Sequence, residues 1–135
     1  MPLVNWNVFE KLPGAVTENF EILCRAVVWL HYGKDGEFKA LKNQPGVEFH
    51  LHLNSDCALG KSSQWFGWQC KWYQLNSSGE LYSKQKKDIL DAMTKTKQYL
   101  PNITDWILCT QYTLSKKDQE WFYGLTINAG MKLDL

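Results

Sequence analysis

The sequence lacks the features that mark membrane proteins, secreted proteins and proteins with C-x-x-C metal or redox motifs. No stretch approaches the roughly 20 apolar residues that a membrane-spanning helix needs. The N-terminus has no charged segment followed by an apolar one, which is the pattern of a signal peptide. The four cysteines form no C-x-x-C pair, so neither a redox motif of that type nor a cysteine-rich zinc site is indicated. We therefore expect a cytoplasmic protein with buried free thiols and no membrane contact.

Neither sign of charge is in excess, and no internal repeat or nucleotide-binding P-loop motif is present. Fifteen Lys and Arg residues stand against 14 Asp and Glu residues, which gives a formal net charge of +1. This balance disfavours a strongly basic protein that coats nucleic acid, and equally a highly acidic one. It still permits a local positive cleft.

The sequence is instead rich in aromatic and other apolar residues. Its 135 residues are 44% hydrophobic and include seven Trp, six Tyr and six Phe. The length suits one domain with a sizeable core. We expect residues 1–135 to form a single domain, and we expect the tryptophans of the strands to be mainly core residues.

The spacing of apolar residues predicts an alternation of helices and strands. Helices are expected at residues 17–32, 83–100 and 115–123, with Thr17, Ser83 and Ser115 as caps, and strands at 38–41, 47–54, 64–73, 105–111 and 125–135. The apolar face expected for the first helix contains Phe20, Leu23, Cys24, Val27 and His31. A helix between strands permits a parallel crossover. The fold class is therefore predicted as α/β, with a mixed central sheet flanked by helices.

Two of these strands alternate between apolar and polar residues. In residues 47–54, Val47 and Phe49 begin the apolar face and Glu48 begins the polar one. In residues 64–73, Gln69 and Lys71 share the polar face. If the two strands pair, Glu48, Gln69 and Lys71 lie together on one face of the sheet.

A carboxylate, an amide oxygen and a lysine in one place suit the hydrolysis of a phosphodiester bond. Oxygen ligands hold Mg²⁺, which neutralises the phosphate and lowers the pKa of water, and a lysine positions or deprotonates that water. Glu21, at the edge of the apolar stripe of the first helix, could add a second carboxylate. An ordinary solvated sheet face explains the same strand pattern, and an ion pair with Arg25 explains Glu21.

The order and motifs of these segments resemble the Mrr-like branch of the PD-(D/E)xK nucleases. The resemblance is carried by Phe20-Glu21, residues 44–49 (Gln-Pro-Gly-Val-Glu-Phe), residues 68–72 (Trp-Gln-Cys-Lys-Trp) and residues 105–110 (Asp-Trp-Ile-Leu-Cys-Thr). The resemblance implies a restriction-endonuclease-like core ordered helix, three strands, helix and strand. The sequence departs from that family at Glu48, where aspartate is commoner.

The resemblance also implies a site and an activity. Its catalytic residues fall on Glu48, Gln69, Lys71 and Glu21, and the metal ligands on Glu48, Gln69 and the carbonyl of Cys70, with Mg²⁺ or Mn²⁺ as cofactor. The implied activity is that of an endonuclease acting on double-stranded DNA. A non-catalytic nuclease-fold module for DNA binding or oligomerisation is the alternative.

A narrower resemblance covers residues 6–125, which are similar to the N-terminal nuclease domain of antiviral STAND NTPases of bacteria. It implies an effector domain cut from a longer chain, whose other domains sense a phage protein and drive homo-oligomerisation. No P-loop motif is present in this sequence.

Two further groups are candidate binding residues. His50 and His52 form an H-x-H pair on the polar face of the first alternating strand, suited to a phosphate contact or, with Cys57 or Cys70, to zinc. Lys84, Lys87 and Lys95 lie on the outer face expected for the second helix and could contact DNA phosphates. Polar residues on a half-exposed strand and a solvated helix face are the alternative explanations.

Overall fold

The computed structural model describes residues 4–41 and 45–135. Its elements are α1 (Trp6–Glu10), α2 (Val16–Tyr32), a 3₁₀ turn (Gly33–Asp35), β1 (Gly36–Ala40), β2 (Phe49–Leu53), β3 (Trp65–Lys71), α3 (Ser83–Tyr99), β4 (Asp105–Thr110), α4 (Lys116–Gly124), α5 (Thr126–Ala129) and β5 (Lys132–Asp134). In these described ranges, no helix is both long and apolar enough to cross a membrane.

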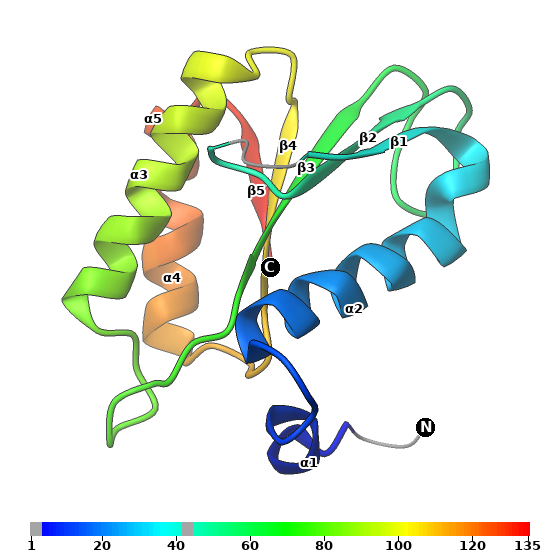
Figure 1. Ribbon diagram of the computed structural model, residues 1–135. Coiled ribbons are helices and arrows are strands. Elements are labelled where there is room, and N and C mark those ends of the chain that lie inside the picture. The colour runs from blue at the N-terminus through cyan, green and yellow to red at the C-terminus, as the bar shows by residue number, and fades with distance from the viewer. Residues whose placement is uncertain (1–3, 42–44) are drawn as a thin grey trace.

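The five strands form one mixed sheet in the order β1-β2-β3-β4-β5 (Figure 1). The first three strands pair antiparallel, whereas β4 runs parallel to β3 and β5 runs parallel to β4. Each parallel pair is joined by a helical crossover, α3 in one case and α4 with α5 in the other. The predicted α/β class, with a mixed sheet flanked by helices, is confirmed.

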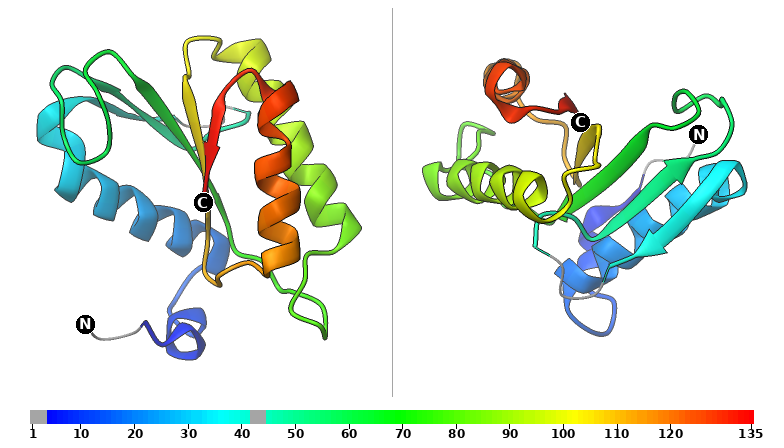
Figure 2. Two further views of the ribbon diagram at one scale, coloured as in Figure 1. Left: turned by 180° about the vertical axis from the view of Figure 1, so that it is seen from behind. Right: turned by 90° about the horizontal axis from the view of Figure 1, so that it is seen from above.

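Helices cover both faces of the sheet (Figure 2). On one face, Phe20 and Val28 of α2 pack with Phe49, Leu51 and the other apolar residues of β2 and β3. On the other face, α3 and α4 enclose a second core around the fully buried Trp106. The strands β1 and β2, at one end of the sheet, lie beyond α3, so their face opposite α2 is less covered (Figure 2).

Several predicted details of the helices are wrong. The residues before α2 and α3 that act as N-caps are Ala15 and Tyr82, not Thr17 and Ser83. Val27 and His31 of α2 are exposed, because the helix packs on the sheet through Phe20, Cys24 and Val28 at a spacing of four residues. Ser115 does cap α4, since its hydroxyl accepts a hydrogen bond from the Asp118 backbone N–H at 3.1 Å.

The last predicted strand is wrong in its first half. The alternating apolar residues of 125–135 predict a continuous strand, but residues 126–129 form α5. Gly130, in the left-handed region with φ +67°, ends this helix and turns the chain into β5. Together, α4 and α5 form the crossover after which β5 runs parallel to β4.

The alternation of β2 breaks at its start. Val47 packs in the core beneath α3, whereas Phe49 packs in the core beneath α2. The change of face falls at Glu48: its backbone N–H bonds to the Trp68 carbonyl at 2.8 Å although Phe49 is the register partner of Trp68, so two residues stand against one, as in a β-bulge. The expectation that Val47 and Phe49 share a face is therefore wrong, and Glu48 occupies the end of the strand rather than its flat polar face.

Gly46 is held tightly against α3, and this contact predicts a stability effect. A Cβ at Gly46 would lie 2.8 Å from the backbone N of Thr96 and 2.9 Å from the carbonyl of Ala92. We expect Gly46→Ala to lower the free energy of unfolding by about 3 kcal/mol, through overpacking and the positive φ together. Chemical denaturation measures this loss.

Gly79 provides the matched control for this substitution. Its φ is also positive, at +72°, but a Cβ there would meet no atom within 4 Å. Gly79→Ala therefore carries only the backbone strain, about 1 kcal/mol. Equal losses in the two variants would contradict the close packing of Gly46 on α3.

Candidate active site

The candidate site lies along the edge of β3 that β2 leaves unpaired, because β3 extends beyond the end of β2. The ladder between β2 and β3 ends at the pair Phe49 and Trp68. The Trp68 carbonyl points toward β2, so Cys70, two residues further on, directs its N–H and its carbonyl toward the same edge. No residue of β2 lies opposite Cys70. A backbone donor and a backbone acceptor are therefore free for a side chain or a ligand.

The Glu48 carboxylate fills part of this edge. Its Oε2 accepts a hydrogen bond from the Cys70 N–H at 2.9 Å, and its Oε1 accepts one from the Gln69 Nε2 at 2.6 Å. Gln69 is only 5% exposed, so the amide that holds Glu48 has little freedom to turn toward bulk water. The predicted proximity of Glu48 and Gln69 is confirmed by the hydrogen bond between their side chains.

Lys71 completes the arrangement at the end of β3. It lies two residues after Gln69 and therefore on the same face of the strand. A cavity of about 420 Å³ between the sheet and α3 is lined by Glu48, Gln69 and Lys71 together. The carboxylate, the amide and the ammonium group that the sequence predicted to converge do meet in one cavity.

Residues of α3 also line this cavity, and the sequence did not predict them as site residues. They are Asp88, Asp91, Ala92 and Lys95. Their spacing of three and four residues marks one stripe of a helix, next to the buried stripe of Ile89, Met93 and Thr96. The spacing predicts a polar border beside the buried stripe, but such a border exists on both sides of that stripe, so it does not by itself show which side faces Glu48 and Lys71.

The surroundings of Glu48 change its acidity. The pKa of Glu48 is raised to about 7, chiefly by burial and also by the negative charge of Glu21. The Cys70 N–H and the positive charge of Lys71 act in the opposite direction. Glu48 is consequently poised between its protonated and ionised forms near neutral pH.

Glu21 lies apart from this cavity. It sits on α2, which covers the other face of the sheet, and it does not line the cavity that contains Glu48 and Lys71. Burial raises the pKa of Glu21, and the neighbouring charge of Arg25 lowers it. The effect of Glu21 on the site therefore acts through its charge on Glu48.

The two predicted histidines form a separate feature next to the site. His52 stacks on Trp65 with ring centroids 4.0 Å apart, and His50 meets the same indole edge-on at 5.4 Å. Burial and the nearby charge of Lys39 lower the pKa of His50, which favours its neutral form. Neither histidine lines the cavity of Glu48.

The predicted lysines of α3 are exposed and lie outside the cavity. Lys84 and Lys87 are near the N-terminal end of the helix, whereas Lys95, predicted on the same outer face, lines the cavity instead. This placement of Lys95 corrects the expectation that all three share the outer face. Lys84 and Lys87 can contact only a substrate that extends beyond the cavity along α3.

A zinc site built on the histidines does not form. Cys70 points to the face opposite Gln69, where its sulfur lies near those of Cys24 and Cys109. Within the described part of the chain, these three cysteines are the one cluster of three or more His, Cys, Asp or Glu side chains arranged to hold a metal. The four cysteines are free thiols, as the sequence predicted, but only Cys70 is buried, whereas Cys24, Cys57 and Cys109 are partly buried.

No model of a known protein family and no curated protein matches the chain. The family suggested by the motifs therefore stays a prediction.

Proposed function

We propose that the chain is a metal-dependent DNA endonuclease, with its active site at the end of β3. The observation that carries this proposal is that Glu48, Gln69 and Lys71 line one cavity, while the backbone N–H of Cys70 holds the Glu48 carboxylate. A carboxylate that can hold a cation, with a lysine beside it, suits metal-assisted attack of water on a phosphodiester.

The oxygen atoms at this edge fit a hard divalent cation. Glu48 offers two carboxylate oxygens, Gln69 bonds through its Nε2 and leaves its Oε1 available, and the Cys70 carbonyl points to the same edge. Mg²⁺ and Mn²⁺ prefer such oxygen ligands. When bound, the cation would neutralise the scissile phosphate and lower the pKa of an attacking water.

The charges that line the cavity leave room for a dication. Three carboxylates, of Glu48, Asp88 and Asp91, face two ammonium groups, of Lys71 and Lys95. With Glu48 ionised, the lining carries an excess of one negative charge. Glu48 is protonated below its pKa of about 7, so cation binding in that range releases a proton.

Each protein group has a role in this proposal. Glu48, Gln69 and the Cys70 carbonyl hold the cation, and Lys71 orients the attacking water or accepts its proton. Glu21 tunes Glu48 by its charge. Lys84 and Lys87 contact the backbone of double-stranded DNA outside the cavity, and His50 with His52 forms a second contact surface along β2.

The place of this activity in a larger assembly follows from the resemblance alone. We propose an antiviral effector that homo-oligomerises through domains beyond this sequence, where a phage protein is sensed. Clustering of several copies would bring several nuclease sites onto one DNA molecule and raise their effective concentration.

Metal dependence is the first test of this function. We expect the chain to nick or linearise supercoiled plasmid in Mg²⁺ or Mn²⁺ and to lose this activity completely in excess EDTA, because no described group replaces the cation at the phosphate. Gel analysis of plasmid forms against time measures the rate. Re-addition of Mg²⁺ after chelation is the control for irreversible loss of fold.

The same experiment separates the proposal from its alternative. A non-catalytic module would retard plasmid or duplex DNA on a native gel yet leave it intact in Mg²⁺ and in Mn²⁺. A calorimetric titration with Mg²⁺ then decides whether the oxygen site at Glu48 binds a cation at all.

A further inference from the structure

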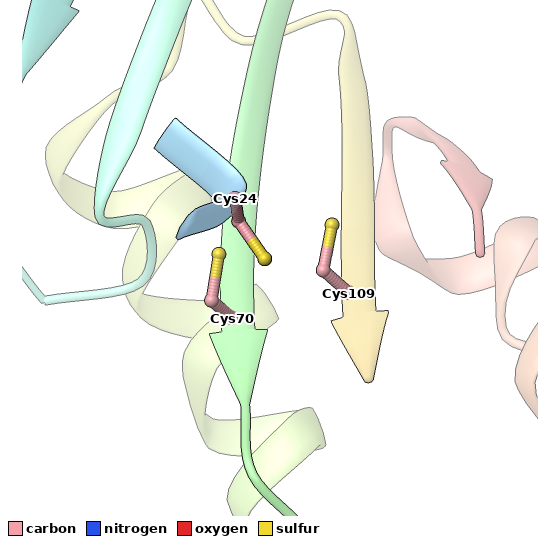
Figure 3. A group of neighbouring side chains, drawn as sticks. All are labelled: Cys24, Cys70 and Cys109. Carbon is pink, nitrogen blue, oxygen red and sulfur yellow. The ribbon is translucent and has the colours of Figure 1, made fainter. Parts of the chain in front are cut away.

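Three cysteines from distant parts of the sequence meet on the side of β3 opposite Glu48. Cys24 comes from α2, Cys70 from β3 and Cys109 from β4, and their side chains point toward one another (Figure 3). The three sulfur atoms all lie within 4.8 Å of one another. Cys70 and Cys109 are also register partners on neighbouring parallel strands.

We propose that Cys24, Cys70 and Cys109 bind one Zn²⁺ ion, with three sulfur ligands and a fourth position open to a neighbouring cavity. Three thiolates are a soft ligand set that favours Zn²⁺ over the hard cations suited to Glu48. This inference does not depend on the nuclease activity, because it rests on different atoms and a different class of cation.

The distances suit a zinc site with little rearrangement. A Zn–S bond of about 2.3 Å in tetrahedral geometry places the sulfurs about 3.8 Å apart. The observed limit of 4.8 Å requires each sulfur to move by less than about 1 Å. Rotation about the Cα–Cβ bonds of Cys24 and Cys109 supplies such a shift, since both side chains are only partly buried.

A route to the sulfur atoms exists. A cavity of about 590 Å³ between α2 and the end of β4 is lined by Cys24 and Cys109 but not by Cys70. Water or a small ligand in this cavity can take the fourth position of the ion, which three-ligand zinc sites leave open. Cys70, 8% exposed, forms the closed side of the site.

The position of the cluster connects it to the oxygen site. The backbone N–H of Cys70 holds Glu48, while the side chain of the same residue belongs to the cluster. Zinc would tie α2 to β3 and β4 at this residue. Occupancy of the sulfur site would therefore stabilise the strand edge that positions Glu48.

Zinc binding by the purified, reduced chain tests the inference. We expect one Zn²⁺ per chain by competition with a chromophoric chelator, and a Co²⁺ complex with a thiolate charge-transfer band. Cys24→Ser and Cys109→Ser should each weaken Zn²⁺ binding by ~100-fold or more, because each removes a direct ligand.

Cys57 gives the matched control, because it is the fourth cysteine and lies outside the cluster. Cys57→Ser should bind Zn²⁺ like the wild type, and circular dichroism should confirm the fold of all three variants. The inference is overturned if the wild type binds no Zn²⁺, or if both cluster variants bind as tightly as the wild type. Loss of DNA cleavage with unchanged Zn²⁺ binding would bear on the proposed function alone.

Discussion

Replacing Lys71 with alanine is expected to lower the rate of Mg²⁺-dependent plasmid cleavage by ~100-fold or more, the usual contribution of a positioned acid–base group. The side chain lies at the end of β3 and lines the cavity together with Glu48 and Gln69. Its loss removes the one cationic group that follows Gln69 on the same face of β3. Single-turnover cleavage of plasmid, at saturating Mg²⁺, measures the effect on the chemical step.

The fold is expected to survive this substitution. Lys71 is half-buried at the last position of its strand, and the strand edge is held by backbone pairing with β4 and by Glu48. Thermal unfolding of Lys71→Ala should therefore follow that of the wild type closely. Lys71→Arg keeps the charge but cannot accept a proton, so its activity separates positioning from proton transfer.

Lys95 offers a matched control for charge alone. It lines the same cavity from α3, yet it does not follow Gln69 on β3. Lys95→Ala should weaken DNA binding and raise KM, with a small change in kcat. A variant set in which Lys95→Ala is inactive while Lys71→Ala keeps full activity would contradict the role given to Lys71.

Local pattern was enough to predict the central part of the site. Period-two alternation on β3 places Gln69 and Lys71 on one face, and pairing of β2 with β3 brings Glu48 to them, as observed. The alternation fails between Val47 and Phe49, which pack on opposite faces of the sheet because Glu48 and Phe49 both stand against Trp68. An extra residue of this kind in one strand leaves no periodic signal in the neighbouring side chains.

Residues contributed by packing between distant elements could not be predicted in the same way. The sequence alone places Asp91 and Lys95 on a solvated helix face. They line the cavity with Lys71 only because α3 packs on the sheet at this point. Cys24 and Cys109 are far apart in the sequence, and they meet only because α2 packs across the parallel pair of β3 and β4. A crossover of this kind is a property of the topology, which no local spacing encodes.

Glu48→Gln is expected to abolish cleavage and, at the same time, to stabilise the cation-free chain above neutral pH. The pKa of Glu48 is raised to about 7 in the folded state from its ordinary value of 4.5, chiefly by burial. Between pH 4.5 and about pH 7, the folded state therefore holds a proton on Glu48 that the unfolded state has released. The stability that the protonated form contributes is complete below pH 4.5 and is lost as the pH rises through 7.

Glutamine keeps the shape of Glu48 and carries no charge at any pH. Its oxygen can accept the Cys70 N–H, and its amide can donate to Gln69 if the Gln69 amide turns over. At pH 8 we expect a gain of about 1–3 kcal/mol over the wild type, reduced from the full linkage value because the carboxylate is partly open to the cavity. At pH 4 the difference should vanish.

Glu21→Gln tests the cause of this pH dependence without touching the oxygen site. The Glu21 charge raises the pKa of Glu48 from across the sheet, so its removal should move the pH midpoint of the stability curve downward. Cleavage in Mg²⁺ should continue, because Glu21 does not line the cavity.

A Glu48→Gln variant that is less stable than the wild type at pH 8, with both proteins compared in excess chelator, would contradict the conclusion that the buried carboxylate destabilises the cation-free fold. Stabilisation together with complete loss of cleavage would mark Glu48 as a residue kept for cation binding at the expense of stability. If the carboxylate had a purely structural role, its replacement would lower the free energy of unfolding instead of raising it.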